Sequence, residues 1–193
     1  MSIRWDQIAF FINPFEQGEC HHPGIIKNTQ KFLNSINFDL NLSDLVTHSM
    51  SSVFSNYIIA KPIYWKSWLD LANKFYTYAK DNLEVNNATM HRGASNIALK
   101  VFIQERLSSI ILSRHRFKVI TPEIGINGPI TLDFFENDYR TRRLLTSLDL
   151  MKEKFCNSGD QIFLQAFYKL RKEIRLNSNS RAGKIAYKLV NAK

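Results

Sequence analysis

The stretch SNIALKVFIQERLSSIILSRH, residues 95–115, is apolar over most of its length and decides the character of the fold. Between residues 97 and 112, apolar side chains would fall on nearly every side of a helix, and such a helix is buried on most sides. Glu105 and Arg106 stand in its middle. Because an unpaired buried charge is very unfavourable, these two side chains require either partners or a function.

Two interpretations of this pair stay open. In the structural interpretation, Arg106 forms an intramolecular ion pair with a carboxylate elsewhere in the chain, and Glu105 caps a loop. In the functional interpretation, Glu105 is an acid, a base or a hydroxyl-binding carboxylate at the wall of a cleft.

Helices are predicted on both sides of the central stretch. Residues 24–36 carry apolar side chains at helical spacing, and a helix that opens at Pro62 carries a regular stripe of aromatic and aliphatic residues. Further helices are predicted at 137–155 and 160–176. Two short segments are rich in β-branched and aromatic residues and are expected to be strands, namely 53–60, as a buried strand, and 117–121. The expected fold class is therefore α/β and helix-rich.

The segment FEQGECHHPG, residues 15–24, gathers two carboxylates, a thiol and two imidazoles before the helix at 24–36. Cys and His are the usual ligands of zinc, but adjacent Cys20, His21 and His22 would have difficulty reaching one ion in tetrahedral geometry. We therefore expect a polar loop that faces substrate and lines a surface cleft without structural zinc.

The composition is that of an ordinary globular protein, with 193 residues, 45% hydrophobic and 22% charged. Its two cysteines do not make a disulfide framework, which favours a reducing compartment. The N-terminal segment lacks the uninterrupted apolar core of a signal peptide. These features predict a cytoplasmic protein.

Positive charge gathers in the second half of the chain. Residues 1–100 carry nine Lys and Arg against eight Asp and Glu, whereas residues 101–193 carry 17 against nine. An anionic partner is therefore expected there. One candidate is the inner face of an anionic membrane, and nucleic acid is the less favoured one because no nucleic-acid-binding motif is present. The residues expected to contact a membrane or phosphate groups are Lys169, Arg171, Lys172 and Arg175.

Three segments carry a resemblance to a known family: EQGECHHPG (16–24), NYIIAKPIYWKSWLD (56–70) and VFIQERLSSIIL (101–112). Their order resembles the C-terminal half of bacterial glycosyltransferase-like proteins of capsule and lipopolysaccharide biosynthesis. The resemblance covers residues 13–122. It implies a partial or compact GT-A-like domain over residues 1–158, forming the acceptor-side portion, with residues 159–193 as a basic C-terminal helix and tail. It also implies transfer of a sugar from a nucleotide-sugar to a saccharide or lipid-linked acceptor.

The resemblance also implies roles for individual residues. Glu105 matches the Glu of the family's Glu-Arg-Leu motif, and a carboxylate suits glycosyl transfer because the attacking hydroxyl needs a general base. The residues implied to bind substrate are Glu19, His21, His22, Asn56 and Arg106. The alternative function is that of a non-catalytic basic module that binds nucleic acid or an anionic membrane surface.

Two features of the family are not found in the sequence. The chain lacks the Asp-x-Asp pair that holds a divalent cation against the pyrophosphate, and the nearest substitute is Glu136-x-Asp138. It also lacks the family's N-terminal nucleotide-binding unit, which is expected to come from a partner subunit or a preceding region.

Overall fold

The computed structural model describes residues 4–55, 57–91, 94–115, 117–120 and 127–191. The chain divides into two compact units, of which unit 1 comprises residues 1–13, 46–50 and 120–193, and unit 2 comprises residues 14–45 and 51–119. Helices dominate the described residues, whose only strands form one antiparallel hairpin. The prediction of a helix-rich chain is confirmed.

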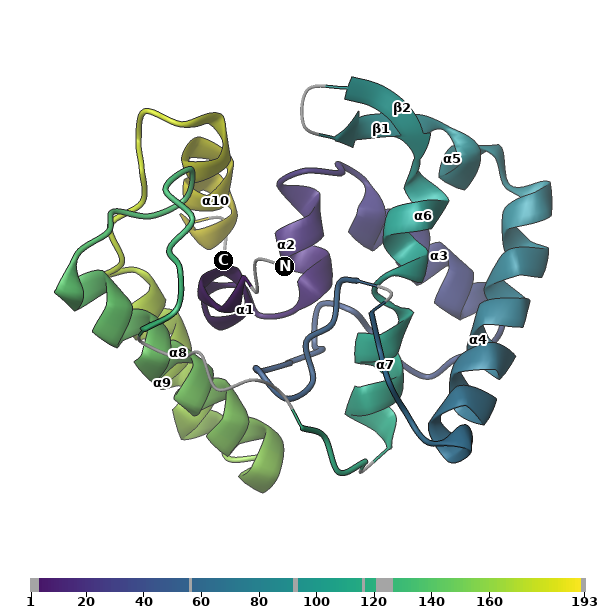
Figure 1. The fold of residues 1–193 in the computed structure, drawn as a ribbon, viewed down its shortest axis with the longest axis horizontal. Helices are drawn as coiled ribbons and strands as arrows, with labels where there is room; N and C mark the ends of the chain where they lie inside the picture. Colours follow the sequence, from purple (N-terminus) through teal and green to yellow (C-terminus); the bar gives the residue numbers. More distant parts are fainter. Residues whose placement is uncertain (1–3, 56, 92–93, 116, 121–126, 192–193) are drawn as a thin grey trace. The chain divides into compact units, whose positions relative to one another are not determined.

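Unit 2 contains the central apolar stretch. Its elements are the helices α2 (Pro14–Glu19), α3 (Ile25–Ser35), α4 (Pro62–Asp81), α5 (Leu83–Asn86), α6 (Leu99–Gln104) and α7 (Leu107–Arg114), and the hairpin strands β1 (Ala88–His91) and β2 (Ala94–Ala98) (Figure 1). Its core lies where α3, α4, α6 and α7 meet, and the rings of Phe32 and Phe75 pack edge to face there at 5.0 Å between centroids.

The long helix α4 confirms the helix predicted to open at Pro62. Proline is favoured at the first helical position, where its missing N–H is not needed. The helix buries Tyr64, Leu71, Phe75 and Ala79, whose spacing places them on one face against the core.

The central stretch does not form the single helix predicted over residues 97–112. Residue 97 belongs to β2, helix α6 ends at Gln104, and α7 begins at Leu107. At the break, the Arg106 N–H donates to the Ile103 carbonyl at 3.0 Å, an i to i−3 bond that tightens the turn. The two charged residues that interrupt the apolar pattern therefore lie where the helix is interrupted.

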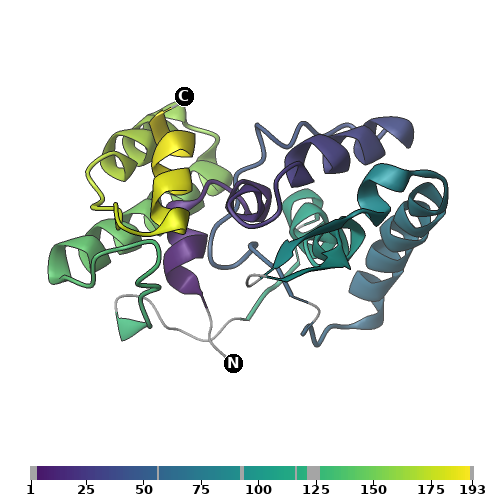
Figure 2. The same cartoon turned by 90° about the horizontal axis from the view of Figure 1, so that it is seen from above.

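Unit 1 is built on a pair of antiparallel helices. Its helices are α1 (Trp5–Phe10), α8 (Tyr139–Ser158), α9 (Gln161–Arg171) and α10 (Arg181–Asn191). Asp138 caps α8 by accepting a hydrogen bond from the Thr141 N–H at 2.7 Å, and Gly159, at φ +74°, turns the chain toward α9. Helices α8 and α9 pack side by side, with α1 against α8 (Figures 1 and 2). None of the described helices is both long and apolar enough to cross a membrane.

Both strand predictions are wrong for the described residues. Residues 57–60 are irregular extended chain rather than a buried strand, and Ile59 is fully exposed. Residues 117–120 are likewise outside any strand. β-branched side chains favour an extended backbone, but a strand also needs a hydrogen-bonded neighbour, and the described part of the chain supplies none to either segment.

The ends of the chain hold more helix than the sequence predicts. The sequence predicts a helix at 160–176 followed by a basic tail, whereas the helix ends at Arg171. The tail forms α10, with Gly183, Ala186 and Val190 buried. Those side chains are small, so their helical spacing is inconspicuous among the surrounding polar residues.

Candidate functional site

Arg106 lies at the centre of the candidate site and is 3% exposed. Its Nε donates to the Pro14 carbonyl, its Nη1 to the Phe102 carbonyl and its Nη2 to Gln17 Oε1, each at 2.9 Å. The guanidinium therefore joins α2 to the end of α6. Burial lowers the pKa of Arg106 to about 10, which leaves it charged at neutral pH. The structure thus gives Arg106 a positioning role, with its hydrogen-bond donors directed at the protein.

Gly18 allows this close approach of α2 to the guanidinium. A Cβ atom at this position would lie 3.2 Å from Arg106 Nε and 3.1 Å from the side chain of Ile25. Both distances are tighter than ordinary van der Waals contact. The absence of a side chain at residue 18 therefore leaves the space that the Arg106 guanidinium occupies against α2.

Glu105 faces a different environment from its neighbour. Its side chain is 27% exposed, and its Oε2 lies 4.0 Å from Arg106 Nη1. Burial raises the pKa of the Glu105 carboxyl above its ordinary value, and the charge of Arg106 offsets only part of that rise. Glu105 is thus a partly accessible carboxylate with an increased proton affinity, which is the property expected of a general base.

The histidines of the polar segment take two different positions. His22 is 3% exposed, and its ring stacks on that of Phe102 at 3.5 Å between centroids. His21 is half-buried, with its ring centroid 6.0 Å from that of His22. The buried thiol of Cys20 has its pKa raised to about 12, by burial first and then by Glu16 and Glu19. A thiol with that pKa stays protonated at neutral pH and is a poor nucleophile.

Glu19 caps helix α3. Its carboxylate oxygens accept hydrogen bonds from the Gly24 N–H at 2.8 and 3.0 Å and from the Ile25 N–H at 3.1 Å. Burial raises the pKa of this carboxyl, although the backbone hydrogen bonds act in the opposite direction. Such bonds satisfy N–H groups that the first helical turn leaves without partners. Glu19 therefore has a structural task in this structure.

The polar segment is mostly interior rather than the lining of a surface cleft, which corrects the prediction. Its first half is helix α2, and its buried residues are Phe15, Glu16, Gln17, Gly18, Cys20 and His22. Phe15 and Ile25, at the two ends, are both fully buried and draw the segment into the core.

The structure brings the predicted residues of the polar segment and of the helix break into one unit. Asn56, the remaining predicted substrate-binding residue, lies outside the described residues. Sequence reasoning missed Gln17 and Phe102, which contact Arg106 and His22. For Gln17 the sequence offered only indirect information, because a buried arginine requires acceptors and the polar segment is rich in acceptor side chains.

The basic residues predicted to contact phosphate groups lie in unit 1. Lys169, Lys172 and Arg175 are exposed. Arg171 is 2% exposed, with its Cζ 5.6 Å from the ring centroid of Phe10 and 5.3 Å from that of Phe167. The prediction that Arg171 contacts phosphate groups or a membrane is therefore wrong, because the helical periodicity turns this residue into the core.

The substitute for the Asp-x-Asp pair does not fit a metal site. Glu136 forms an ion pair with Arg175 at 3.8 Å, and Asp138 caps α8. Among the residues that the structure describes, no three His, Cys, Asp or Glu side chains are placed to hold one ion.

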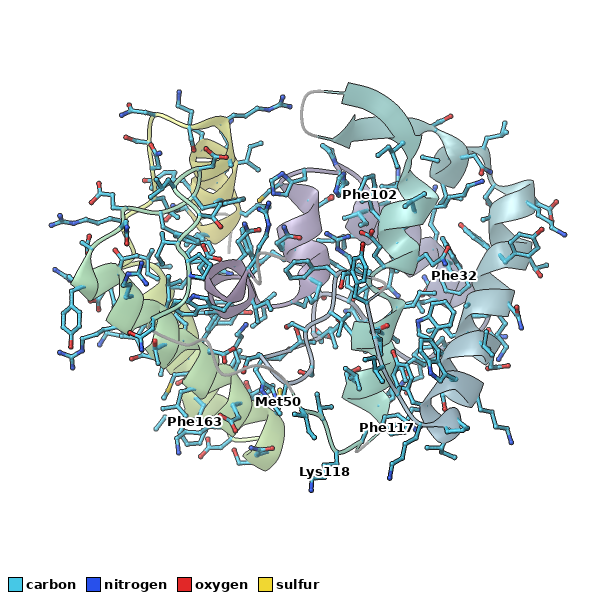
Figure 3. The ribbon with its side chains drawn as sticks, viewed as in Figure 1. Phe32, Met50, Phe102, Phe117, Lys118 and Phe163 are labelled. Atoms are coloured by element: carbon cyan, nitrogen blue, oxygen red, sulfur yellow. The ribbon has the colours of Figure 1, made fainter. Side chains whose placement is uncertain are left out.

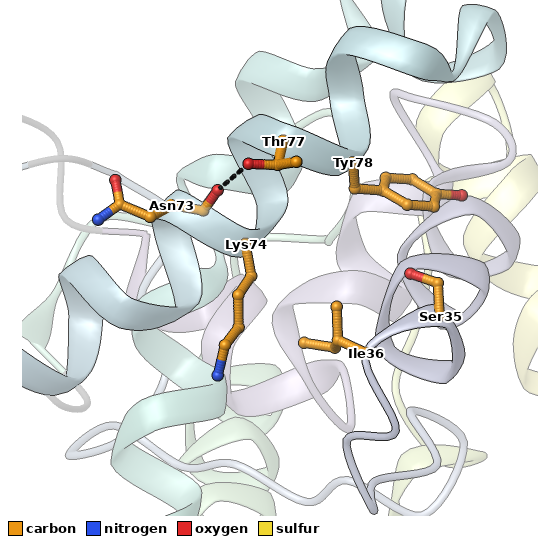
Figure 4. A pocket seen from close by; sticks show the side chains of 6 residues that line it. All are labelled: Ser35, Ile36, Asn73, Lys74, Thr77 and Tyr78. Atoms are coloured by element: carbon orange, nitrogen blue, oxygen red, sulfur yellow. Dashed lines mark hydrogen bonds between the residues drawn. The ribbon is translucent and has the colours of Figure 1, made fainter.

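A separate hollow of about 420 Å³ lies between the end of α3 and the middle of α4 (Figure 4). Its lining residues are Ser35, Ile36, Asn73, Lys74, Thr77 and Tyr78. Lys74 is the only charged residue of this lining, and its Nζ lies 2.8 Å from Asp70 Oδ2. The hollow contains none of the predicted site residues and offers no carboxylate for catalysis.

Comparison of the chain with protein-family models, with curated proteins and with solved structures finds no match in any of the three. The candidate site therefore has to be interpreted from its own chemistry.

Proposed function

We propose that this chain is the acceptor-side portion of a GT-A-like glycosyltransferase of bacterial surface polysaccharide biosynthesis. In this proposal, a sugar passes from a nucleotide-sugar to a saccharide or lipid-linked acceptor, and Glu105 is the general base. The described strands form only a hairpin, so the proposal assigns the nucleotide-binding sheet to further polypeptide.

The observation that supports this proposal is the bond between Arg106 Nη2 and Gln17 Oε1, at 2.9 Å. It joins two of the segments that carry the resemblance, which are separated by 89 positions in the sequence. A contact between segments so far apart is not a consequence of local sequence, and it holds the helix break that bears Glu105 against α2.

The chemistry of Glu105 also suits this role. A general base must be ionised when the acceptor arrives and must also bind the hydroxyl proton, so a carboxyl pKa above the ordinary value improves proton transfer near neutral pH. Burial produces that rise in pKa while 27% of the side chain remains exposed. Arg106 and Glu19, by contrast, hold the turn and α3 in place. Because no three ligand side chains of the described residues are placed to hold one ion, the proposal assigns no step to a metal.

The test is saturation-transfer NMR of the full chain with a panel of bacterial surface oligosaccharides, because the proposal assigns the acceptor side to this chain and the nucleotide-binding sheet to further polypeptide. We expect at least one of these ligands to bind, and we expect Glu105→Gln to weaken its binding at least about tenfold, as loss of one charge-assisted hydrogen bond would. Glu84→Gln is the matched control, because Glu84 is an exposed carboxylate of the same unit, paired with Lys31 at 2.6 Å. Absence of binding to every ligand, or equal binding by Glu105→Gln, would contradict the proposal.

A further inference from the structure

Three large apolar side chains are exposed in the segment that leads into α4 and in its first turn. Tyr57 is 81% exposed, Ile59 is 104% exposed and Ile63 is 64% exposed. We call these three residues the apolar tip. Side chains alternate along the extended chain here, so Ile58 and Ala60 pack against the core while their neighbours point outward.

The segment that carries the apolar tip is anchored on both sides. Before it, the Val53 N–H donates to Ser109 Oγ at 2.6 Å, and Ser109 Oγ donates to the Val53 carbonyl at 2.9 Å. After it, the Tyr64 hydroxyl is bonded to Ser108 Oγ at 2.8 Å. The ring of Phe117 packs edge to face on Tyr64 at 5.6 Å. The exposed side chains of the apolar tip are therefore carried by a segment that is hydrogen-bonded to α7 on both sides.

Exposed lysines accompany the apolar tip. Lys61, Lys66 and Lys118 are exposed, and none of them has an ion-pair partner among the described residues. Figure 3 shows Lys118 directed away from the ribbon, next to Phe117. The nearest acidic residue along α4 is Asp70, whose carboxylate is bound to Lys74 at 2.8 Å. An anionic partner is thus favoured at the apolar tip.

We propose that the apolar tip and its three lysines dock unit 2 onto an anionic lipid surface. Aliphatic side chains such as Ile59 and Ile63 gain by leaving water for the acyl region, and tyrosine is favoured at the headgroup level. Lysines just outside the apolar side chains meet anionic headgroups. Nucleic acid fits less well, because its bases stack on aromatic rings and gain little from isoleucine.

This docking surface is independent of the proposed glycosyl transfer and differs from the basic face of α9 considered from the sequence. The residues proposed to contact lipid are not among those proposed to act in catalysis. Vesicle binding is measured without any sugar substrate, so failure of one proposal leaves the other standing.

The test is flotation of the full chain with vesicles of 70% phosphatidylcholine and 30% phosphatidylserine, and with vesicles of pure phosphatidylcholine. We expect binding to the anionic vesicles that weakens with salt, and we expect Ile59→Ser/Ile63→Ser to reduce the partition coefficient at least about tenfold. Lys61→Ala/Lys66→Ala should reduce binding to the anionic vesicles alone. Leu83→Ser is the matched control and should bind as the wild type does, since Leu83 is 80% exposed in the same unit but is flanked by acidic residues.

Three results of the vesicle assay would overturn the proposal. The first is a wild-type chain that does not bind the anionic vesicles, and the second is an Ile59→Ser/Ile63→Ser variant that binds as well as the wild type. The third is loss of binding on Lys169→Ala/Lys172→Ala with the tip variant unaffected, which would move the lipid contact to α9. Sedimentation velocity supplies a further check, because a wild-type dimer that the tip variant abolishes would identify a second copy of the chain as the occupant.

Discussion

Arg106 in unit 2 and Lys152 in unit 1 are both buried cations that bind main-chain carbonyl oxygens, yet their surroundings differ. Lys152 Nζ donates to the Ile8 carbonyl and, at 2.8 Å, to the Phe11 carbonyl, at the end of α1. A positive charge there satisfies carbonyls that the last helical turn leaves without partners.

The difference lies in what stands beside each cation. Lys152 lies within the continuous helix α8, and the next residue, Glu153, is exposed. Arg106 lies at a helix break, and the preceding residue, Glu105, is a partly accessible carboxylate with a raised pKa. A buried cation by itself therefore indicates a structural role, and the proposed function depends instead on the carboxylate beside Arg106, which is partly buried whereas Glu153 is exposed.

The largest expected effect on stability is that of removing the Arg106 guanidinium, which we call the arginine clamp because it joins α2 to the end of α6. Arg106→Met removes the guanidinium that donates to the Pro14 and Phe102 carbonyls and to the Gln17 side chain, and we expect the free energy of unfolding to fall by about 3–5 kcal/mol. Urea denaturation measures the change. Arg114→Met, at an exposed arginine of the same unit, should change it by less than about 0.5 kcal/mol. Equal effects of the two substitutions would show that Arg106 is not a clamp.

A somewhat smaller effect is expected for the lysine clamp. Lys152→Met keeps most of the apolar stem but leaves two carbonyls of α1 and its end without this donor, so we expect a loss of about 2–4 kcal/mol. The measurement is again urea denaturation, with the exposed Lys169→Met as the control. A loss larger than that of Arg106→Met would reverse the proposed ranking of the clamps.

Removal of the α3 cap should have a still smaller effect. Glu19→Ala takes away the side-chain acceptor of the Gly24 and Ile25 N–H groups, the second of which also donates to the His22 carbonyl, and loss of such a cap costs about 1 kcal/mol. Thermal unfolding should show a modestly lower Tm, whereas Asp81→Ala, at an exposed residue that ends α4, should leave the Tm almost unchanged. An unchanged Tm for Glu19→Ala would contradict the capping role, and Glu19 would again be a candidate for substrate binding.

The same comparison shows what could be predicted from the sequence. Arg106 was identified as needing partners because it interrupts an apolar pattern, and the helices α3, α4, α8 and α9 were predicted from their periodicity. Lys152 could not be identified, because the surrounding sequence MKEKF has the alternating charges of an exposed helical face.

The strand predictions and the site geometry failed for a related reason. Local sequence indicates which backbone conformation a segment prefers, but it does not indicate whether a neighbouring strand exists, as residues 57–60 illustrate. Likewise, the polar segment was predicted to be a loop that faces substrate and lines a surface cleft, whereas most of it is buried. The segment supplies Gln17 as an acceptor to the buried Arg106, and the two residues are 89 positions apart in the sequence, so this contact could not be read from local sequence.

The most direct test of the central claim is the free energy of unfolding of Glu105→Gln relative to the wild type, measured between pH 4 and pH 7. The raised pKa means that folding favours the protonated carboxyl, so this group stabilises the fold fully below its unfolded pKa, and that contribution is lost as the pH rises through the folded pKa. The account predicts that Glu105→Gln, which stays uncharged, is at least as stable as the wild type at pH 7, and that its relative stability increases with pH. A loss of about 3–5 kcal/mol at pH 7 would instead make Glu105 the structural ion-pair partner of Arg106 and contradict the account.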